Sequence, residues 1–132
     1  MAINGLGILW AVIVNPIALP PLYSHWQDHH ITLQYGVERL QWEHLIGLPM
    51  TVGVLEVAFN DRIQVIKVIL PTWASCQNPY PHITLSWVDG GAPIEANAML
   101  LSGNYQQQSI EQEVIHTTIE WLDWKKSALS NS

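Results

Sequence analysis

The feature that most constrains this chain is a tetrapeptide that occurs twice. Residues 30–33 read His-Ile-Thr-Leu, and the same four residues recur at 82–85. Each copy alternates polar with apolar side chains, so on a β-strand the histidine and threonine share one face while the isoleucine and leucine point into a core. The sequence therefore predicts two matching strands, each presenting one imidazole and one hydroxyl on the same face.

Two such strands that face one cleft would form a chemically useful site. Imidazole titrates near pH 6.5, so two histidines can divide the duties of general acid and general base near neutral pH. The threonine hydroxyls can donate hydrogen bonds to a bound anion. The alternative is two unrelated strands that share a preference for β-branched residues.

This constellation resembles the 2H phosphoesterase superfamily, whose members have two His-x-Ser/Thr motifs around a cleft. Within it, the chain is most similar to the cyclic phosphodiesterase type found with tRNA ligases and RNA-repair proteins, and to related phage forms. The resemblance extends over roughly residues 7–124, and the short spacing between the motifs departs from larger members. It rests on His30, Thr32, His82 and Thr84, on ILWAVIV (8–14) and on GGAPIEANAMLL (90–101).

The resemblance implies an α+β fold with two pseudo-symmetric lobes and antiparallel sheets around a central cleft. It also implies a metal-independent phosphodiesterase, without a cofactor, that hydrolyses 2',3'-cyclic phosphate in RNA ends or small nucleotides. His30 and His82 would act as acid and base, in an order that the sequence leaves open, and Thr32 and Thr84 would bind the phosphate. We expect one domain over 1–132, with a frayed tail at 126–132.

Three other functions stay open at this point. The same residues could cleave a 3',5'-linked cyclic nucleotide or oligonucleotide by activating a ribose 2'-hydroxyl. The cleft could instead bind a nucleotide without turning it over. Finally, the repeat could be accidental in a structural domain, in which case the two histidines would lie far apart.

Composition narrows the class of partner. Hydrophobic residues make up 48% of the chain and charged residues 12%, which excludes a disordered protein. The net charge is −6, and the five Lys and Arg residues are too few to bind long duplex nucleic acid through many phosphate contacts. The lone Cys76 cannot form an internal disulfide, which favours a reducing, cytoplasmic setting. The sequence leaves the oligomeric state open.

The apolar run within residues 5–22 is too short for a membrane span and is better explained as a buried first strand. Hydrophobic patterning also predicts a weak helix over 38–46 and a helix over 93–101 that Gly103 follows. Asn60-Asp61-Arg62 is typical of a tight hairpin. We predict strands at 8–14, 31–35 (closed by Gly36), 51–59, 63–70, 82–88 and 114–121.

Other polar and aromatic residues are weaker candidates. Tyr80 could line the pocket, and Lys67 could contact phosphate, although such a lysine more often extends from a sheet edge to solvent. Tyr35 and Trp87 are expected to pack against neighbours. Cys76 is expected to be a packed residue and not a catalytic thiol. His25 and His29 have the only spacing that suits a metal, and neither these nor His44 and His116 belong to a motif.

Overall fold

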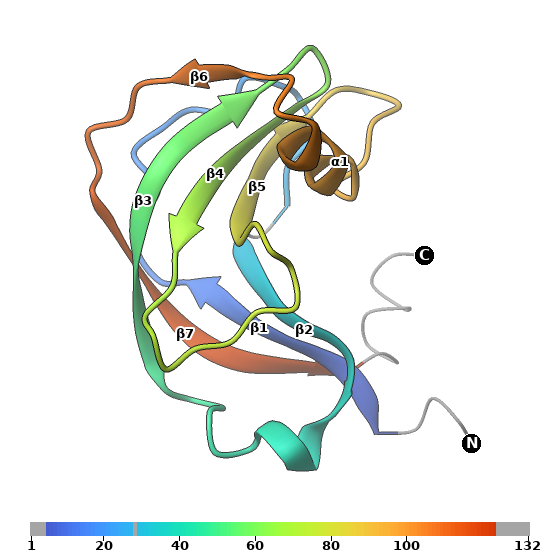
Figure 1. Ribbon diagram of the computed structural model, residues 1–132, viewed down its shortest axis with the longest axis vertical. Helices are drawn as coiled ribbons and strands as arrows, with labels where there is room; N and C mark the ends of the chain where they lie inside the picture. The colour runs from blue at the N-terminus through green and yellow to red at the C-terminus, as the bar shows by residue number, and fades with distance from the viewer. Residues whose placement is uncertain (1–4, 28, 124–132) are drawn as a thin grey trace.

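The structure is a computed structural model that describes residues 5–27 and 29–123. The predicted frayed tail at 126–132 lies outside the described residues. Antiparallel strands dominate, with a single α-helix among the described residues (Figure 1). The elements are β1 (Leu6–Ile13), β2 (His30–Glu38), η1 (Arg39–Trp42), β3 (Pro49–Phe59), β4 (Ile63–Ile69), β5 (His82–Trp87), α1 (Glu95–Ser102), β6 (Gln106–Gln108) and β7 (Val114–Asp123).

Hydrogen bonds join these strands into one sheet. Its order is β2-β1-β7-β3-β4-β5, with β6 paired to β3. Strand β3 makes the sheet continuous, because its first residues, 49–53, pair with β7 and its residues 53–59 pair with β4. The α+β class is confirmed. The prediction of separate antiparallel sheets is wrong, because β3 pairs with β7 on one side and with β4 on the other and so joins all the strands into one sheet.

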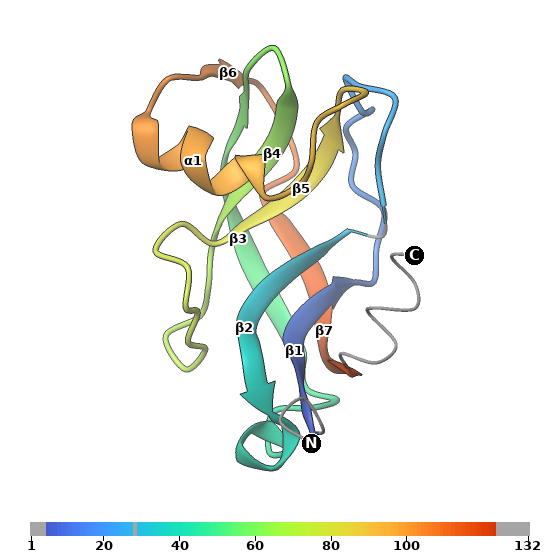
Figure 2. The same ribbon diagram turned by 90° about the vertical axis from the view of Figure 1, so that its right-hand side faces the viewer.

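The sheet curls until its two end strands meet. Strands β2 and β5 lie at opposite ends of the hydrogen-bonded order, yet they contact each other. Figures 1 and 2 show the resulting shape, a nearly closed barrel in which β2 and β5 are neighbours in space. These end strands are the two that contain the His-x-Thr motifs.

The interior of the barrel is the main hydrophobic core. Ile31 and Leu33 of the first motif and Ile83 and Leu85 of the second are each at most 1% exposed and belong to the same buried cluster. The prediction that these four side chains point into a core is confirmed. Burying side chains of this size stabilises the fold by about 1.5–3 kcal/mol each, so the core holds both motif strands in place.

A smaller core lies beneath the helix. Ala96, Met99 and Leu100 of α1 pack against Ala58 of β3 and Val65 of β4. The helix ends where the sequence predicts, because Gly103 adopts a left-handed conformation with φ of 72° and its N–H donates to the Met99 carbonyl. The helix thereby covers the face of the sheet beside the second motif (Figure 2).

Both motif strands have the same irregularity at the same position. Leu33 has no partner in the β1–β2 register, and Leu85 has none in the β4–β5 register. Such a bulge shifts the alternation of side chains by one residue. The next residues, Gln34 and Ser86, are consequently buried at 7% and 0% exposure, although strict alternation would direct them outward.

Every predicted strand is present, and no end differs from the prediction by more than three residues; the largest difference is at the end of β2. Gly36 does not close its strand, because β2 continues to Glu38 through a second register shift at a left-handed glycine with φ of 70°. The apolar run near the N-terminus forms β1 as predicted. No helix among the described residues has the length and apolar character needed to cross a membrane.

The weak helix predicted over 38–46 is reduced to a short 3-10 helix, η1, followed by turns. The hydrogen bonds that follow η1 join residues three apart, from the Leu45 N–H to Trp42 and from the Ile46 N–H to Glu43. The sequence did not predict β6, whose three glutamines have no strand-like pattern.

We expect Gly7→Ala to destabilise the protein. A Cβ at position 7 would lie 2.3 Å from the Leu122 carbonyl oxygen and 2.7 Å from the Trp121 ring, so β1 and β7 would have to separate. Overpacking of this kind costs about 1–3 kcal/mol. Denaturant unfolding monitored by tryptophan fluorescence measures the loss.

Gly53→Ala is the matched control, because it also adds a methyl group to a glycine in a strand. The nearest atom to its new Cβ would be the Ile69 Cβ at 3.8 Å, an ordinary contact. If Gly7→Ala were as stable as Gly53→Ala, the close approach of β1 and β7 would be refuted.

Candidate active site

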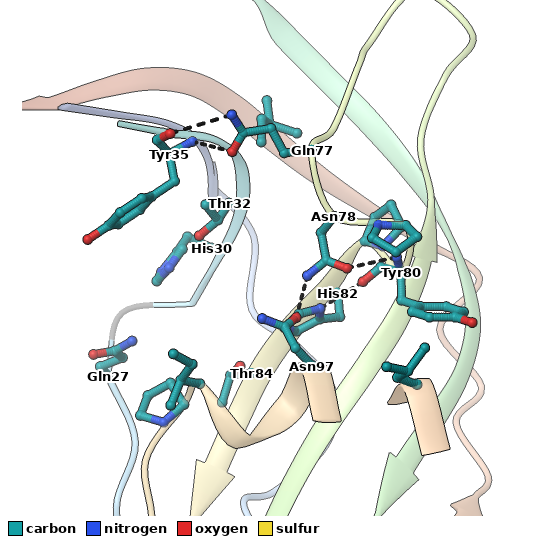
Figure 3. A pocket seen from close by; sticks show the side chains of 16 residues that line it. Gln27, His30, Thr32, Tyr35, Gln77, Asn78, Tyr80, His82, Thr84 and Asn97 are labelled. Carbon is teal, nitrogen blue, oxygen red and sulfur yellow. Dashed lines mark hydrogen bonds between the residues drawn. The ribbon is translucent and has the colours of Figure 1, made fainter. Parts of the chain in front are cut away.

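Both motifs line one cavity of about 790 Å³ between the end strands of the sheet. His30 and Thr32 come from β2, and His82 and Thr84 come from β5 (Figure 3). A cavity of 300–1,000 Å³ is the usual size for a small-molecule site. The structure therefore brings together the four residues that the repeat singled out.

The two histidines occupy different surroundings. The ring of His30 lies against Trp10 of β1, with ring centroids 4.5 Å apart and the planes tilted by 53°. In the second motif, the Nδ1 atom of His82 lies 2.8 Å from the carbonyl oxygen of Tyr80. Because a carbonyl only accepts hydrogen bonds, we assign the proton of the neutral His82 ring to Nδ1, which leaves a lone pair on Nε2.

Burial lowers the pKa of His82 below its ordinary value of about 6.5, although the hydrogen bond to the Tyr80 carbonyl acts in the opposite direction. Burial favours the neutral ring because a charged imidazolium loses solvation. At neutral pH, His82 is therefore neutral, with Nε2 able to accept a proton.

Of the two weaker candidates, Tyr80 and Lys67, only the first lines the cavity among the described residues. Lys67 is not among the described residues that line it, and its ammonium lies 3.2 Å from Glu56 and 3.4 Å from the Tyr105 hydroxyl. Burial acts to lower the pKa of Lys67, but the hydrogen bonds to Glu56 and Tyr105 raise it overall. Strand β4 is an inner strand, so Lys67 does not extend from a sheet edge either.

Tyr35 was expected to pack against neighbours, and this prediction is wrong. It is 59% exposed and lines the cavity on the same strand as the first motif. The bulge at Leu33 explains the error, because it shifts the alternation of side chains by one residue. Trp87 does pack as predicted, against the core beneath α1, and it stacks on His25 with centroids 6.3 Å apart.

The remaining residues lie away from the cavity lining. His25 Nε2 is 3.2 Å from Asp89, whereas His29 Nε2 is 3.3 Å from the Leu85 carbonyl. Burial raises the pKa of the Cys76 thiol, which donates to the Thr32 carbonyl at 3.4 Å. Within 5–27 and 29–123, no three His, Cys, Asp or Glu residues form a group able to hold a metal ion.

Several polar residues of the cavity escaped sequence reasoning. Gln77 and Asn78 come from the loop that precedes β5, and Asn97 comes from α1. The one sequence signal was Asn78-Pro79, which is typical of a turn and lies just before the second motif. A turn signal does not reveal that the loop returns to β2 and α1.

Comparison with known proteins identifies a family for this chain. Residues 21–123 match the family described as the fungal tRNA ligase phosphodiesterase domain, a span that includes both motifs. No curated protein and no solved structure matches the chain. The match extends over most of the chain, and the matched family is the type that the two His-x-Thr motifs had indicated. The chain therefore belongs to the fungal tRNA ligase phosphodiesterase domain family, a 2H phosphoesterase family of cyclic phosphodiesterases.

Proposed function

We propose that this protein hydrolyses 2',3'-cyclic phosphate at an RNA end or on a small nucleotide, without a metal, by acid-base catalysis with two histidines. The observation that supports this most directly is that both His-x-Thr motifs line one cavity. Family membership supports the cyclic phosphodiesterase class. Two imidazoles and two hydroxyls supply the groups that the reaction needs.

His82 acts as the base in this proposal. Its Nε2 takes a proton from water as the water oxygen forms a bond to phosphorus. The bond from phosphorus to one ribose oxygen breaks, and protonated His30 gives that oxygen a proton. The lowered pKa of His82 supports this order, because a base must be neutral before it acts.

The hydroxyls of Thr32 and Thr84 donate hydrogen bonds to the non-bridging phosphate oxygens. Negative charge on these oxygens rises as water attacks, so fixed donors stabilise the transition state more than the substrate. Thr32 is exposed and Thr84 is half-buried, and both line the cavity.

The charges around the site favour a substrate with one phosphate in the cavity. No Lys or Arg occurs among the described residues that line it. Each Lys and Arg within 5–27 and 29–123 is paired with a glutamate, at distances between 2.6 and 3.7 Å. Binding therefore depends on the terminal nucleotide and not on many backbone phosphates.

We call the His and Thr of one motif a half-site, so His30 with Thr32 is one half-site and His82 with Thr84 is the other. Pseudo-symmetry of these two half-sites is part of the proposal. The identical bulge at Leu33 and Leu85 supports a relation between the two motif strands. The runner-up reaction, attack by a ribose 2'-hydroxyl in a 3',5'-linked cyclic nucleotide, would use the same four side chains. A panel of both substrate types separates the two reactions.

His30→Ala and His82→Ala should each lower the turnover of 2',3'-cyclic nucleotides at least about a hundredfold, because each removes one proton-transfer group. Activity of the unchanged protein should survive EDTA. His116→Ala is the control, because this histidine contacts Thr51 and is not among the residues lining the cavity.

Full activity in either motif variant would exclude that histidine from the mechanism. Tight nucleotide binding without product would indicate a binding module.

The pH dependence of kcat/KM should be bell-shaped, with its acid limb below pH 6.5. His82 must be neutral to act, so the rate falls as pH falls through its folded pKa, and burial places that pKa below the ordinary value. An acid limb centred at or above pH 6.5 would contradict the assignment of His82 as the base. Initial rates between pH 4.5 and 9 at constant ionic strength give the profile.

Salt should have little effect on KM. Neutralising one phosphate predicts a change of about threefold or less between 50 and 200 mM KCl, whereas many phosphate contacts predict about 10³-fold or more. A cyclic mononucleotide and an RNA oligonucleotide with the same end should behave alike. A steep salt dependence for the oligonucleotide alone would show that more of the RNA is bound.

A further inference from the structure

The short segment 77–80 links the two motif strands. Strands β2 and β5 are the ends of the sheet, and no strand ladder in the described part of the chain joins them. Segment 77–80 lies between them, and Figure 3 shows its hydrogen bonds to both sides of the cavity. Its position suggests a role in fixing how the two half-sites face each other.

Gln77 binds the segment to β2, just after the first motif. Its backbone N–H donates to the Leu33 carbonyl at 2.9 Å. Its side-chain oxygen accepts from the Tyr35 N–H at 2.9 Å, and its side-chain nitrogen donates to the Tyr35 carbonyl at 3.4 Å. Gln77 thus occupies the edge of β2 at the bulge, where a further strand would otherwise pair.

Asn78 binds the segment to the second half of the site. Its side-chain nitrogen donates to the Asn97 side chain of α1, and its side-chain oxygen accepts from the Tyr80 N–H at 2.8 Å. The second bond closes an Asx turn, which fixes the Pro79–Tyr80 peptide group directly before the Tyr80 carbonyl. The Tyr80 carbonyl then accepts from Nδ1 of His82 at 2.8 Å.

We infer that Gln77 and Asn78 are positioning residues for the two-histidine reaction, an inference that rests on the proposed function. Asn78 sets the Tyr80 carbonyl, and that carbonyl holds His82 in the tautomer whose Nε2 can accept a proton. Gln77 holds the same segment against the strand of His30. The segment thereby fixes both the tautomer of His82 and its placement relative to His30.

Asn78→Ala should lower kcat roughly 10- to 100-fold, because misplacing a reacting group by about 1 Å has effects of this size. Without the Asx turn, the Tyr80 carbonyl no longer holds the proton on Nδ1. In ¹⁵N NMR spectra of the ligand-free protein, the His82 ring should change from the Nδ1-protonated form to a mixture of tautomers. A purely structural role would not produce this change.

Asn78→Asp separates positioning from direct substrate contact. The carboxylate can still accept from the Tyr80 N–H, and a rotated Asn97 amide can donate to it. We expect the Nδ1-protonated tautomer and most of kcat to return. A lower kcat for Asn78→Asp than for Asn78→Ala would overturn the inference, because repulsion of phosphate would then mark Asn78 as a substrate contact.

Two controls match these variants. Asn60 makes a similar turn in the β3–β4 hairpin, where its side chain accepts from the N–H groups of Arg62 and Ile63, so Asn60→Ala loses comparable bonds away from the site. Gln112 is the control for Gln77, because its side chain also binds backbone groups. Its oxygen accepts from the Ala18 N–H, and its nitrogen donates to the Val114 carbonyl. Gln77→Ala should lower kcat while Gln112→Ala should not. Equal kcat in the two glutamine variants would overturn the role of Gln77.

Asn97→Ala keeps the experiment decisive should Asn78→Ala fail to fold, because it removes the helix partner and leaves the loop sequence intact. Asn97→Ala should also lower kcat, by a smaller factor than Asn78→Ala does. Unchanged kcat and an unchanged His82 tautomer in Asn78→Ala, or in Asn97→Ala if the former does not fold, would overturn the inference and leave the proposed function standing. Absence of turnover by the unchanged protein would instead refute the proposed function, while the NMR readout would still test the link from Asn78 to His82.

Discussion

The closing of the sheet is the constraint on which the rest of this structure depends. The two motif strands are the first and last in the hydrogen-bonded order, so they meet only because the strands between them curl around a shared core. The isoleucine and leucine of each motif belong to that core, and the histidine and threonine of each motif face the cavity. Hydrophobic burial and the chemistry of the site therefore use opposite faces of the same four-residue pattern.

Identical sequences in the two half-sites do not produce identical surroundings. His30 lies against the indole ring of Trp10, and His82 has its Nδ1 beside the Tyr80 carbonyl of the loop before it. Burial then favours the neutral form of His82. Two copies of one sequence pattern thus place their imidazoles in different contacts, and the proposed reaction assigns them different roles.

The absence of Lys and Arg from the described cavity lining gives the site a definite electrostatic character. A monoanionic cyclic phosphate can be bound by hydroxyls and imidazoles, because hydrogen bonds to its oxygens replace those of water. A polyanion would lose solvation without gaining a cation from the described lining. The negative net charge of the chain works in the same direction, and both features are reasons for proposing a single terminal nucleotide as the substrate.

Much of the fold and the centre of the site could be predicted from local patterns. Alternation in His30–Leu33 and His82–Leu85 identified two strands and the faces of their side chains, because the period of a strand is two residues. The turn at Asn60 and the end of α1 at Gly103 were also predictable locally, because turn residues and a glycine after a helix set the conformation of their own backbone. The errors at Tyr35 and Gly36 come from bulges, which depend on pairing with β1 and break the period that sequence reasoning assumes.

By itself, the sequence determined which residues could do chemistry, because residue type and strand period are properties of a few neighbouring positions. Only the tertiary structure decided that the two motifs share a cavity, that Lys67 is engaged by Glu56, and that Gln77 and Asn78 connect the half-sites. Those outcomes depend on contacts between residues distant in the chain, which form only when the sheet closes and the loop before β5 packs against both β2 and α1.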